Sequence, residues 1–218
     1  MRARPHTPPH QIGRVDRLLT FLGGRLIEWR HLQKGCVMEK EPSRIGGWFS
    51  AVAPLWPLGL ARILYGVLWW QQSKWKVPAD DFGRKSGGGL WYWVQQEIQY
   101  PTVPAYKDFL VNVLVPHWTF FGYVTLATET FIAVTLILGL FTRLGAFVAL
   151  GMAVNITIGI LNVPHEWGWT YTMLLMFAAV FFLTGAGRSF GVDAFLGPRL
   201  ERAGDRGNRA ARVLSRLT

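Results

Sequence analysis

Two ionisable side chains lie in the middle of apolar stretches of the sequence, where a charge is costly unless it is paired. Arg62 lies near the centre of residues 52–70, and Glu129 lies at the centre of residues 118–140. A lone charge at the centre of a bilayer costs about 2.5 kcal/mol or more, so we predict that these two side chains pair inside a helix bundle. A carboxylate placed there could relay protons, and a cation could stabilise negative charge that develops on a bound ligand.

Further polar and aromatic side chains fall where they would meet such a ligand. Lys74 follows the first apolar stretch and would place a cation at the mouth of the site, although a lysine there also serves as an anchor among lipid headgroups. We predict that the chemistry is carried by Arg62, Glu129 and Lys74, and that the ligand is contacted by Tyr65, Trp69, Asn155 and His165. The alternative is an ion pair between Arg62 and Glu129 that only fixes the packing of two helices.

The cysteine and histidine content limits the possible redox chemistry. Cys36 is the single cysteine, which excludes an internal disulfide, a covalent c-type haem and an iron–sulfur cluster. His117 and His165 fall on one side of the predicted membrane, but neither projects from the interior of a helix as haem ligands of bundles do. We therefore predict no metal, haem or flavin site, so that redox chemistry would need a bound organic cofactor or a partner chain.

The elements that must position these side chains are four long apolar stretches. They cover residues 52–70, 118–140, 144–163 and 167–187, and helices of 19 to 23 residues reach roughly 28–35 Å at about 1.5 Å per residue. Half of the 218 residues are apolar and only 17% are charged. We predict an all-α integral membrane protein built as a four-transmembrane-helix bundle.

The net charge of +10 suggests nucleic-acid binding until the charges are placed along the chain. Basic residues exceed acidic ones by five in residues 1–58 and by four in residues 188–218, whereas the apolar stretches are nearly free of charge. The excess of basic residues near membrane helices marks the cytoplasmic side, so we predict that both termini are cytoplasmic. The loop of residues 73–117 then faces outward.

The remaining segments flank this membrane domain of residues 51–196. Residues 1–50 form a basic leader that could be an amphipathic surface helix, and Met38 could be the true start instead of Met1. Residues 197–218 form a basic tail that we expect to be solvated near the lipid headgroups. Within the outer loop, apolar side chains recur at helical spacing in residues 90–98 and 106–114, which predicts two short interfacial helices.

The order of short motifs resembles the DoxX/DoxD family of small four-helix membrane proteins. The motifs are Leu60-Ala61-Arg62 with Gly66, then Lys74, a second span that bears Glu129 and runs into residues 139–143, and residues 185–189 followed by Asp193. The long outer loop is closer to the DoxD branch. The family pattern falls on Arg62, Lys74, Glu129, Arg143 and Asp193. The resemblance implies a multi-pass protein of a prokaryotic plasma (inner) membrane, related to the DoxD subunit of thiosulfate:quinone oxidoreductase, which pairs with a DoxA subunit.

Three functions are consistent with these features. The first is a subunit of a quinone-linked oxidoreductase, with quinone as the cofactor and with the lipid bilayer and a DoxA-like or other redox subunit as partners. The second is a non-catalytic accessory or scaffold subunit of a membrane redox complex. The third is a small transporter with Glu129 as a proton carrier, which is disfavoured because the chain shows no internal repeat.

Overall fold

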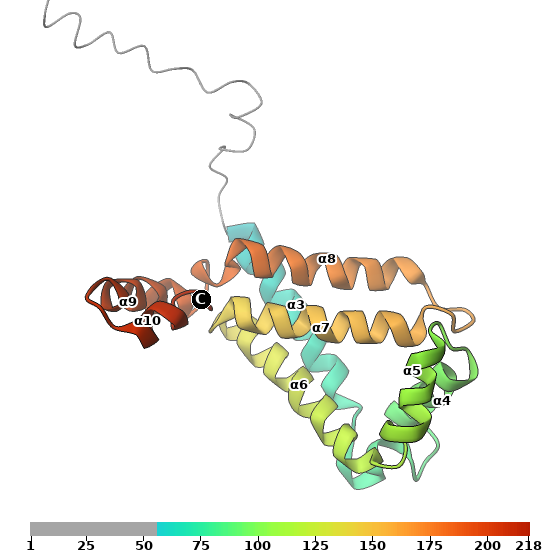
Figure 1. Ribbon diagram of the computed structural model, residues 1–218. Coiled ribbons are helices and arrows are strands. Elements are labelled where there is room, and N and C mark those ends of the chain that lie inside the picture. Colours follow the sequence, from blue (N-terminus) through green and yellow to red (C-terminus); the bar gives the residue numbers. More distant parts are fainter. Residues whose placement is uncertain (1–55) are drawn as a thin grey trace, which may run out of the picture. The chain divides into compact units, whose positions relative to one another are not determined.

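The computed structural model describes residues 56–218, which are helical and contain no β-strand. The four longest apolar helices are α3 (Trp56–Lys74), α6 (Trp118–Leu138), α7 (Thr142–Ile160) and α8 (Gly168–Thr184), shown in Figure 1. Between α3 and α6 lie a 3₁₀ helix (Pro78–Gly83), α4 (Gly89–Gln99), α5 (Pro104–Phe109) and a π-helical turn (Leu110–Leu114). A 3₁₀ turn (Ala186–Arg188), α9 (Asp193–Asp205) and α10 (Arg209–Leu214) follow α8. The predicted leader, with Cys36 and Met38, lies outside the described residues.

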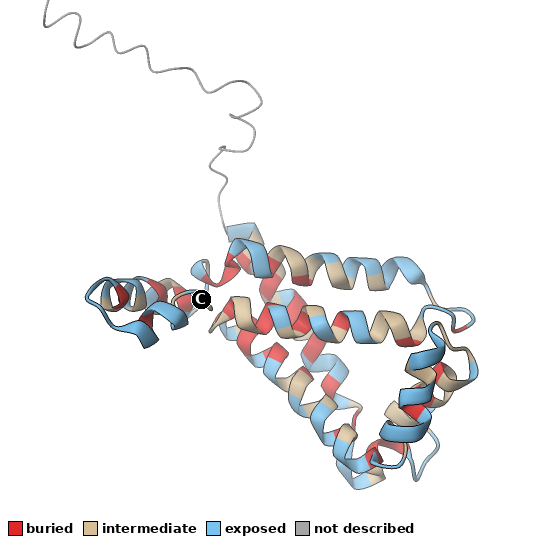
Figure 2. Cartoon of the chain, in the orientation of Figure 1, coloured by how far each residue is buried: buried red, intermediate tan, exposed pale blue. Residues whose placement is uncertain are grey.

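The outward faces of the long helices are apolar. Within the described part of the chain, α6 and α7 are long and apolar enough to cross a membrane, and α8 is a shorter apolar helix. Only 33% of the most apolar window of α6 and 28% of that of α7 is buried, whereas the core helix of a soluble protein is mostly buried. Figure 2 shows the exposed outward surfaces, which carry large apolar side chains such as Phe120, Phe147 and Leu183. Such an outer surface is suited to lipid.

The long helices pack as two pairs. Helix α3 lies against α6, and α7 lies against α8, while α6 and α7 meet at the turn that joins them. Figure 1 shows the pairs diverging from this turn toward the end where α4 and α5 lie. The close approach of α3 and α6 depends on Gly66, because a Cβ atom there would lie 2.9 Å from the side chain of Ile137. Small residues at such positions let two helices approach closely.

The contact at Gly66 sets the register of α3 against α6. Helix α3 ends eight residues after Gly66, so its last turn is level with the middle of α6 rather than with the start of α6. The first two turns of α6 are covered by the 3₁₀ helix instead. Phe82 packs at Gly122, where a Cβ atom would meet its ring at 2.2 Å, and the Trp118 indole N–H donates to the Asp81 carbonyl at 2.7 Å. The loop therefore folds back beside α6.

The short helices were only partly foreseen. The two helices predicted at residues 90–98 and 106–114 are confirmed as α4 and as α5 with its π-helical turn. The basic tail expected from residue 197 onward is helical as well, because α9 starts at Asp193 and continues through Pro198, and α10 follows. Pro198 is the sixth residue of α9, where it cannot donate the helical hydrogen bond to the Ala194 carbonyl.

Candidate functional site

A cavity of about 590 Å³ lies where the two helix pairs diverge. All four long helices contribute to its wall, and α4, α5 and the segments that follow α3, α5 and α7 contribute the rest. Four charged side chains line it, namely Lys76, Glu97, Glu129 and Glu166, together with the aromatic side chains of Trp69, Trp75, Trp93, Tyr106, Trp118, Phe121 and Tyr171. A volume of about 300–1,000 Å³ with apolar walls and few polar groups is typical of sites for small organic molecules.

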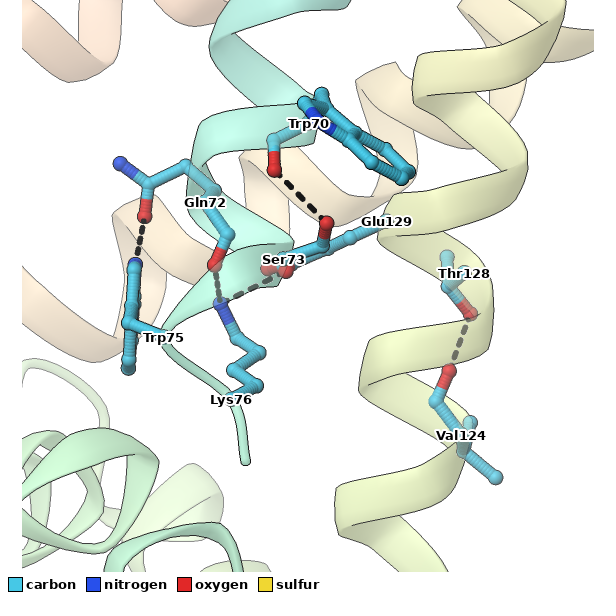
Figure 3. Close-up of polar contacts among 8 residues, drawn as sticks. All are labelled: Trp70, Gln72, Ser73, Trp75, Lys76, Val124, Thr128 and Glu129. Atoms are coloured by element: carbon cyan, nitrogen blue, oxygen red, sulfur yellow. Dashed lines mark hydrogen bonds and ion pairs between the residues drawn. The ribbon is translucent and has the colours of Figure 1, made fainter. Parts of the chain in front are cut away.

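A buried ion pair joins α6 to the residue that follows α3 by two positions. The Lys76 ammonium lies 2.7 Å from a Glu129 carboxylate oxygen, and both side chains are nearly inaccessible, at 4% and 3% exposure. The same ammonium donates to the Gln72 carbonyl at 3.0 Å, as Figure 3 shows, and lies 3.7 Å from the centre of the Trp75 ring. Burial lowers the pKa of Lys76, and the charge of Glu129 opposes that effect. The pair thus places two opposite charges side by side in a largely apolar wall.

The predicted pairing of Arg62 with Glu129 is wrong. Register explains the difference: Arg62 lies beyond Gly66 toward the α6–α7 turn, whereas Glu129 lies level with the end of α3. The separation corresponds to about eleven residues of helix, or roughly 16 Å along the axis. The cation that reaches Glu129 is Lys76, and Lys74 is exposed beside the Trp70 ring, at 5.9 Å from its centre. The lysine in the cavity wall is therefore Lys76 and not Lys74.

Arg62 belongs to a second polar cluster at the other end of the bundle. Its guanidinium is fully buried and donates to the Phe190 carbonyl at 3.0 Å. The buried carboxylate of Asp193 lies near this guanidinium and accepts from the backbone N–H groups of Phe141 and Thr142, both at 2.8 Å. A carboxylate at the start of α7 satisfies N–H groups that the helix cannot pair itself. We assign this cluster to the architecture of the bundle, because Arg62 and Asp193 do not line the cavity.

The wall formed by α4 and α5 contains a hydrogen-bonded carboxyl group. The Tyr106 hydroxyl lies 3.4 Å from a Glu97 carboxylate oxygen and 3.2 Å from the Asn155 side-chain oxygen. Glu97 fits against α7 because Gly159 faces it, where a Cβ atom would lie 2.6 Å from the carboxyl carbon. Burial raises the pKa of Glu97 to about 7, although the bond from Tyr106 opposes the shift, and burial also raises the pKa of Tyr106.

A second tyrosine–glutamate pair lines the cavity from the α7–α8 side. The Tyr171 hydroxyl donates to the Glu166 carboxylate at 2.5 Å. Glu166 belongs to the turn that precedes α8, and Tyr171 lies in the first turn of that helix. The cavity therefore receives a carboxylate from α4, from α6 and from the turn before α8, against the single ammonium of Lys76.

The other predicted ligand contacts divide into two groups. Trp69 and Asn155 line the cavity as expected. Tyr65 is buried behind Trp69, with its ring edge-on at 6.1 Å and its hydroxyl bonded to the Leu174 carbonyl, so it supports the wall without forming it. His165 is exposed in the α7–α8 turn and is not part of the wall. Among the described residues, no three histidine, cysteine, aspartate or glutamate side chains gather as a metal site would require.

Sequence reasoning missed Lys76, Glu97 and Glu166 among the ionisable side chains of the cavity, and both of its tyrosines, Tyr106 and Tyr171. One signal was present for Glu97, which follows Leu90 and Val94 at the spacing of a single helix face. A glutamate on the apolar face of a short amphipathic helix points into the protein. Nothing comparable separates Lys76 from Lys74, because both follow the apolar stretch within a few residues.

Comparison with known families agrees with this architecture. Residues 93–208, more than half of the chain, match the family model described as "TQO small subunit DoxD". The chain belongs to the DoxD family. The match covers Glu97, Tyr106 and Glu129 of this DoxD protein, whereas α3 with Arg62 and the following Lys76 precede it. Searches of curated proteins and of solved structures found no match.

Proposed function

We propose that this DoxD protein is the membrane subunit of a quinone-linked oxidoreductase and that the cavity binds the quinone ring. The observation that carries the proposal is the cavity itself, whose aromatic wall includes a buried ammonium and three carboxyl groups. When bound, a quinone supplies two-electron redox chemistry and takes up two protons. Trp69, Trp75 and Trp118 can pack against a flat ring, and Lys76 and Asn155 can form hydrogen bonds with carbonyl oxygens.

The charge of the cavity favours an uncharged ligand over an anion. With Lys76 paired to Glu129, the remaining charged groups are the carboxyls of Glu97 and Glu166. A dianion such as thiosulfate would meet these carboxyls in a site of low polarity, where like charges repel strongly. The electron donor is therefore expected to bind elsewhere. A partner subunit resembling DoxA is the natural holder, in keeping with the description of the family as a small subunit.

The membrane arrangement completes the proposal. Helices α3, α6, α7 and α8 are proposed to span a prokaryotic inner membrane with both termini in the cytoplasm, following the excess of basic residues at the chain ends. The cavity then opens toward the outer leaflet, and the cluster of Arg62 and Asp193 lies on the cytoplasmic side. The apolar outward faces of α6 and α7 support this arrangement.

Quinone binding by the purified full chain tests the proposal. Quinone should co-purify in mild detergent, and added quinone should quench tryptophan fluorescence, because four tryptophans line the cavity. Thr125→Trp would fill the cavity and should weaken binding about tenfold or more, which corresponds to about 1.4 kcal/mol. Thr128→Trp is the matched control, because Thr128 follows Thr125 by three residues on α6 and does not line the cavity.

The opposite result would favour the second candidate, a non-catalytic accessory subunit. If the wild-type chain neither carries nor binds quinone yet purifies with a stoichiometric redox partner, the quinone proposal fails. Equal binding by Thr125→Trp and Thr128→Trp would show that quinone binds outside the cavity. Both outcomes are distinct from loss of the fold, which circular dichroism of the same preparations reports.

A further inference from the structure

Tyr106 has one hydroxyl proton and two acceptors within reach. Its oxygen lies 3.4 Å from Glu97 Oε2 and 3.2 Å from Asn155 Oδ1. When Glu97 is ionised, the hydroxyl can donate to the carboxylate or to the amide oxygen, but not fully to both. When Glu97 is protonated, it donates to Tyr106, and Tyr106 donates to Asn155. Only the neutral form of Glu97 therefore satisfies both contacts at once.

The packing around Glu97 also favours its neutral form. Its side chain is 9% exposed, and the backbone of α7 approaches it at Gly159. Helix α7 presents Asn155 and Gly159 to this carboxyl and no cation. Among the charged groups that line the same cavity, Lys76 is paired with Glu129, and Glu166 bonds with Tyr171. Burial accordingly raises the pKa of Glu97 to about 7.

We propose that Glu97 is the proton-holding group of the cavity, taking protons from water at the α4–α5 end and passing them to a ligand oxygen. This inference rests on the proposed quinone function. In each transfer the O–H bond at Glu97 Oε2 breaks, the proton moves to the ligand, and the carboxylate left behind accepts the Tyr106 hydroxyl proton as a hydrogen bond. Uptake of a proton from water then turns Tyr106 back toward Asn155.

The transfer balances with the electrons of the proposed reaction. Two electrons come from a reduced sulfur compound held by the partner subunit, and two successive protonations of Glu97 provide the two protons that a quinone takes up. The Lys76–Glu129 pair plays a different part, because its ammonium and carboxylate neutralise each other at 2.7 Å. Glu97 holds a proton, whereas Lys76 offers a fixed hydrogen-bond donor.

Infrared titration of the full chain in detergent tests the proposal without any quinone. The carbonyl stretch of a protonated carboxyl group should disappear as the pH rises through about 7. Glu97→Gln should remove this transition. Glu201→Gln is the matched control and should keep it, because Glu201 is exposed and pairs with Arg188 at the surface.

Two further variants should move the transition in opposite directions. Tyr106→Phe removes the donor that stabilises the carboxylate, so the midpoint should rise. Asn155→Leu removes the competing acceptor and leaves the hydroxyl to Glu97, so the midpoint should fall. If the three residues had only a structural role, Tyr106→Phe and Asn155→Leu would not shift the midpoint in opposite directions. A transition that survives in Glu97→Gln, or that moves in the same direction in both other variants, overturns the proposal.

Quinone binding separates this inference from the proposed function. In Glu97→Gln, the rate of proton-coupled reduction in the assembled complex should lose its dependence on pH near 7. If wild-type protein binds no quinone, the proposed function fails even when the infrared transition is present. If quinone binds and the rate in Glu97→Gln still falls as the pH rises through 7, the role of Glu97 is refuted.

Discussion

Replacing Lys76 by methionine should destabilise the bundle far more than its single lost contact suggests. Methionine keeps the unbranched side chain and removes the charge, so the main change is the loss of the partner of Glu129. The two charged atoms lie 2.7 Å apart and both side chains are at most 4% exposed. Their direct attraction is about 6 kcal/mol at an effective dielectric constant of about 20.

Much of that attraction offsets the cost of removing both ions from water. The intact pair therefore contributes little net stability, whereas a carboxylate left alone in the same place costs about 3–5 kcal/mol. We expect Lys76→Met to lower the free energy of unfolding by that amount. Glu129→Gln should also destabilise, but less, because the flexible lysine side chain can carry its ammonium toward water. The double variant should regain most of the loss.

Reversible unfolding in mixed micelles measures the three variants as a double-mutant cycle. The coupling between Lys76 and Glu129 should amount to about 2–3 kcal/mol. Lys74→Met is the control and should change the free energy of unfolding by less than about 0.5 kcal/mol, because Lys74 is exposed. Additive effects of the two substitutions would refute the reasoning. Strong coupling between Glu129→Gln and Arg62→Met would also refute it, because it would show that Glu129 pairs with Arg62 instead of with Lys76.

Four more substitutions probe other parts of the bundle. Gly139→Ala should lower the free energy of unfolding by about 2 kcal/mol or more, because the residue has φ of 63° and a Cβ there would lie 1.7 Å from the Arg62 guanidinium. At Gly151 a Cβ would meet nothing within 4 Å, so Gly151→Ala should stabilise α7 by about 0.5–1 kcal/mol. Thermal unfolding measures both variants. Asp193→Ala should cost about 1–3 kcal/mol and speed amide exchange at the start of α7. Because the pKa of Glu97 is raised from 4.5 to about 7 by folding, the folded state holds a proton that the unfolded state has lost between these values. Wild type should therefore lose roughly 3 kcal/mol of unfolding free energy from pH 4.5 to above 7, and Glu97→Gln should not lose this part.

The helices were predictable because their signals are local. Apolar runs at residues 118–140, 144–163 and 167–187 correspond to α6, α7 and α8 within three residues at each boundary, and the two loop helices follow from their spacing. Trp69 and Asn155 line the cavity, and each lies on a helix face marked by small or aromatic neighbours. Assignment of these helices to a membrane rests on the same apolar composition.

The pairing of charges was not predictable because it depends on register between two helices. Centring each apolar stretch placed Arg62 level with Glu129, but the contact at Gly66 displaces α3 by about eleven residues relative to that alignment. Hydropathy does not report such a displacement, because it describes each helix by itself and carries no information on the register between two helices. Lys76 reaches Glu129 only because the chain turns beyond α3. That turn depends on Phe82 and Gly122, which are distant in sequence.

The hydrogen bonds that the start of α7 donates to Asp193 can form only after the ribosome has synthesised the chain beyond α8. The carboxylate is encoded 51 and 52 residues after the two N–H groups that it satisfies, and Phe190, which receives the Arg62 guanidinium, follows Arg62 by 128 residues. At about 5–20 residues per second, the ribosome takes roughly 3–10 s to extend the chain from Thr142 to Asp193. During that interval the start of α7 lacks the carboxylate that caps it. Closure of this end of the bundle therefore follows the synthesis of α8, and in the proposed membrane arrangement it would follow the insertion of the hairpin of α6 and α7.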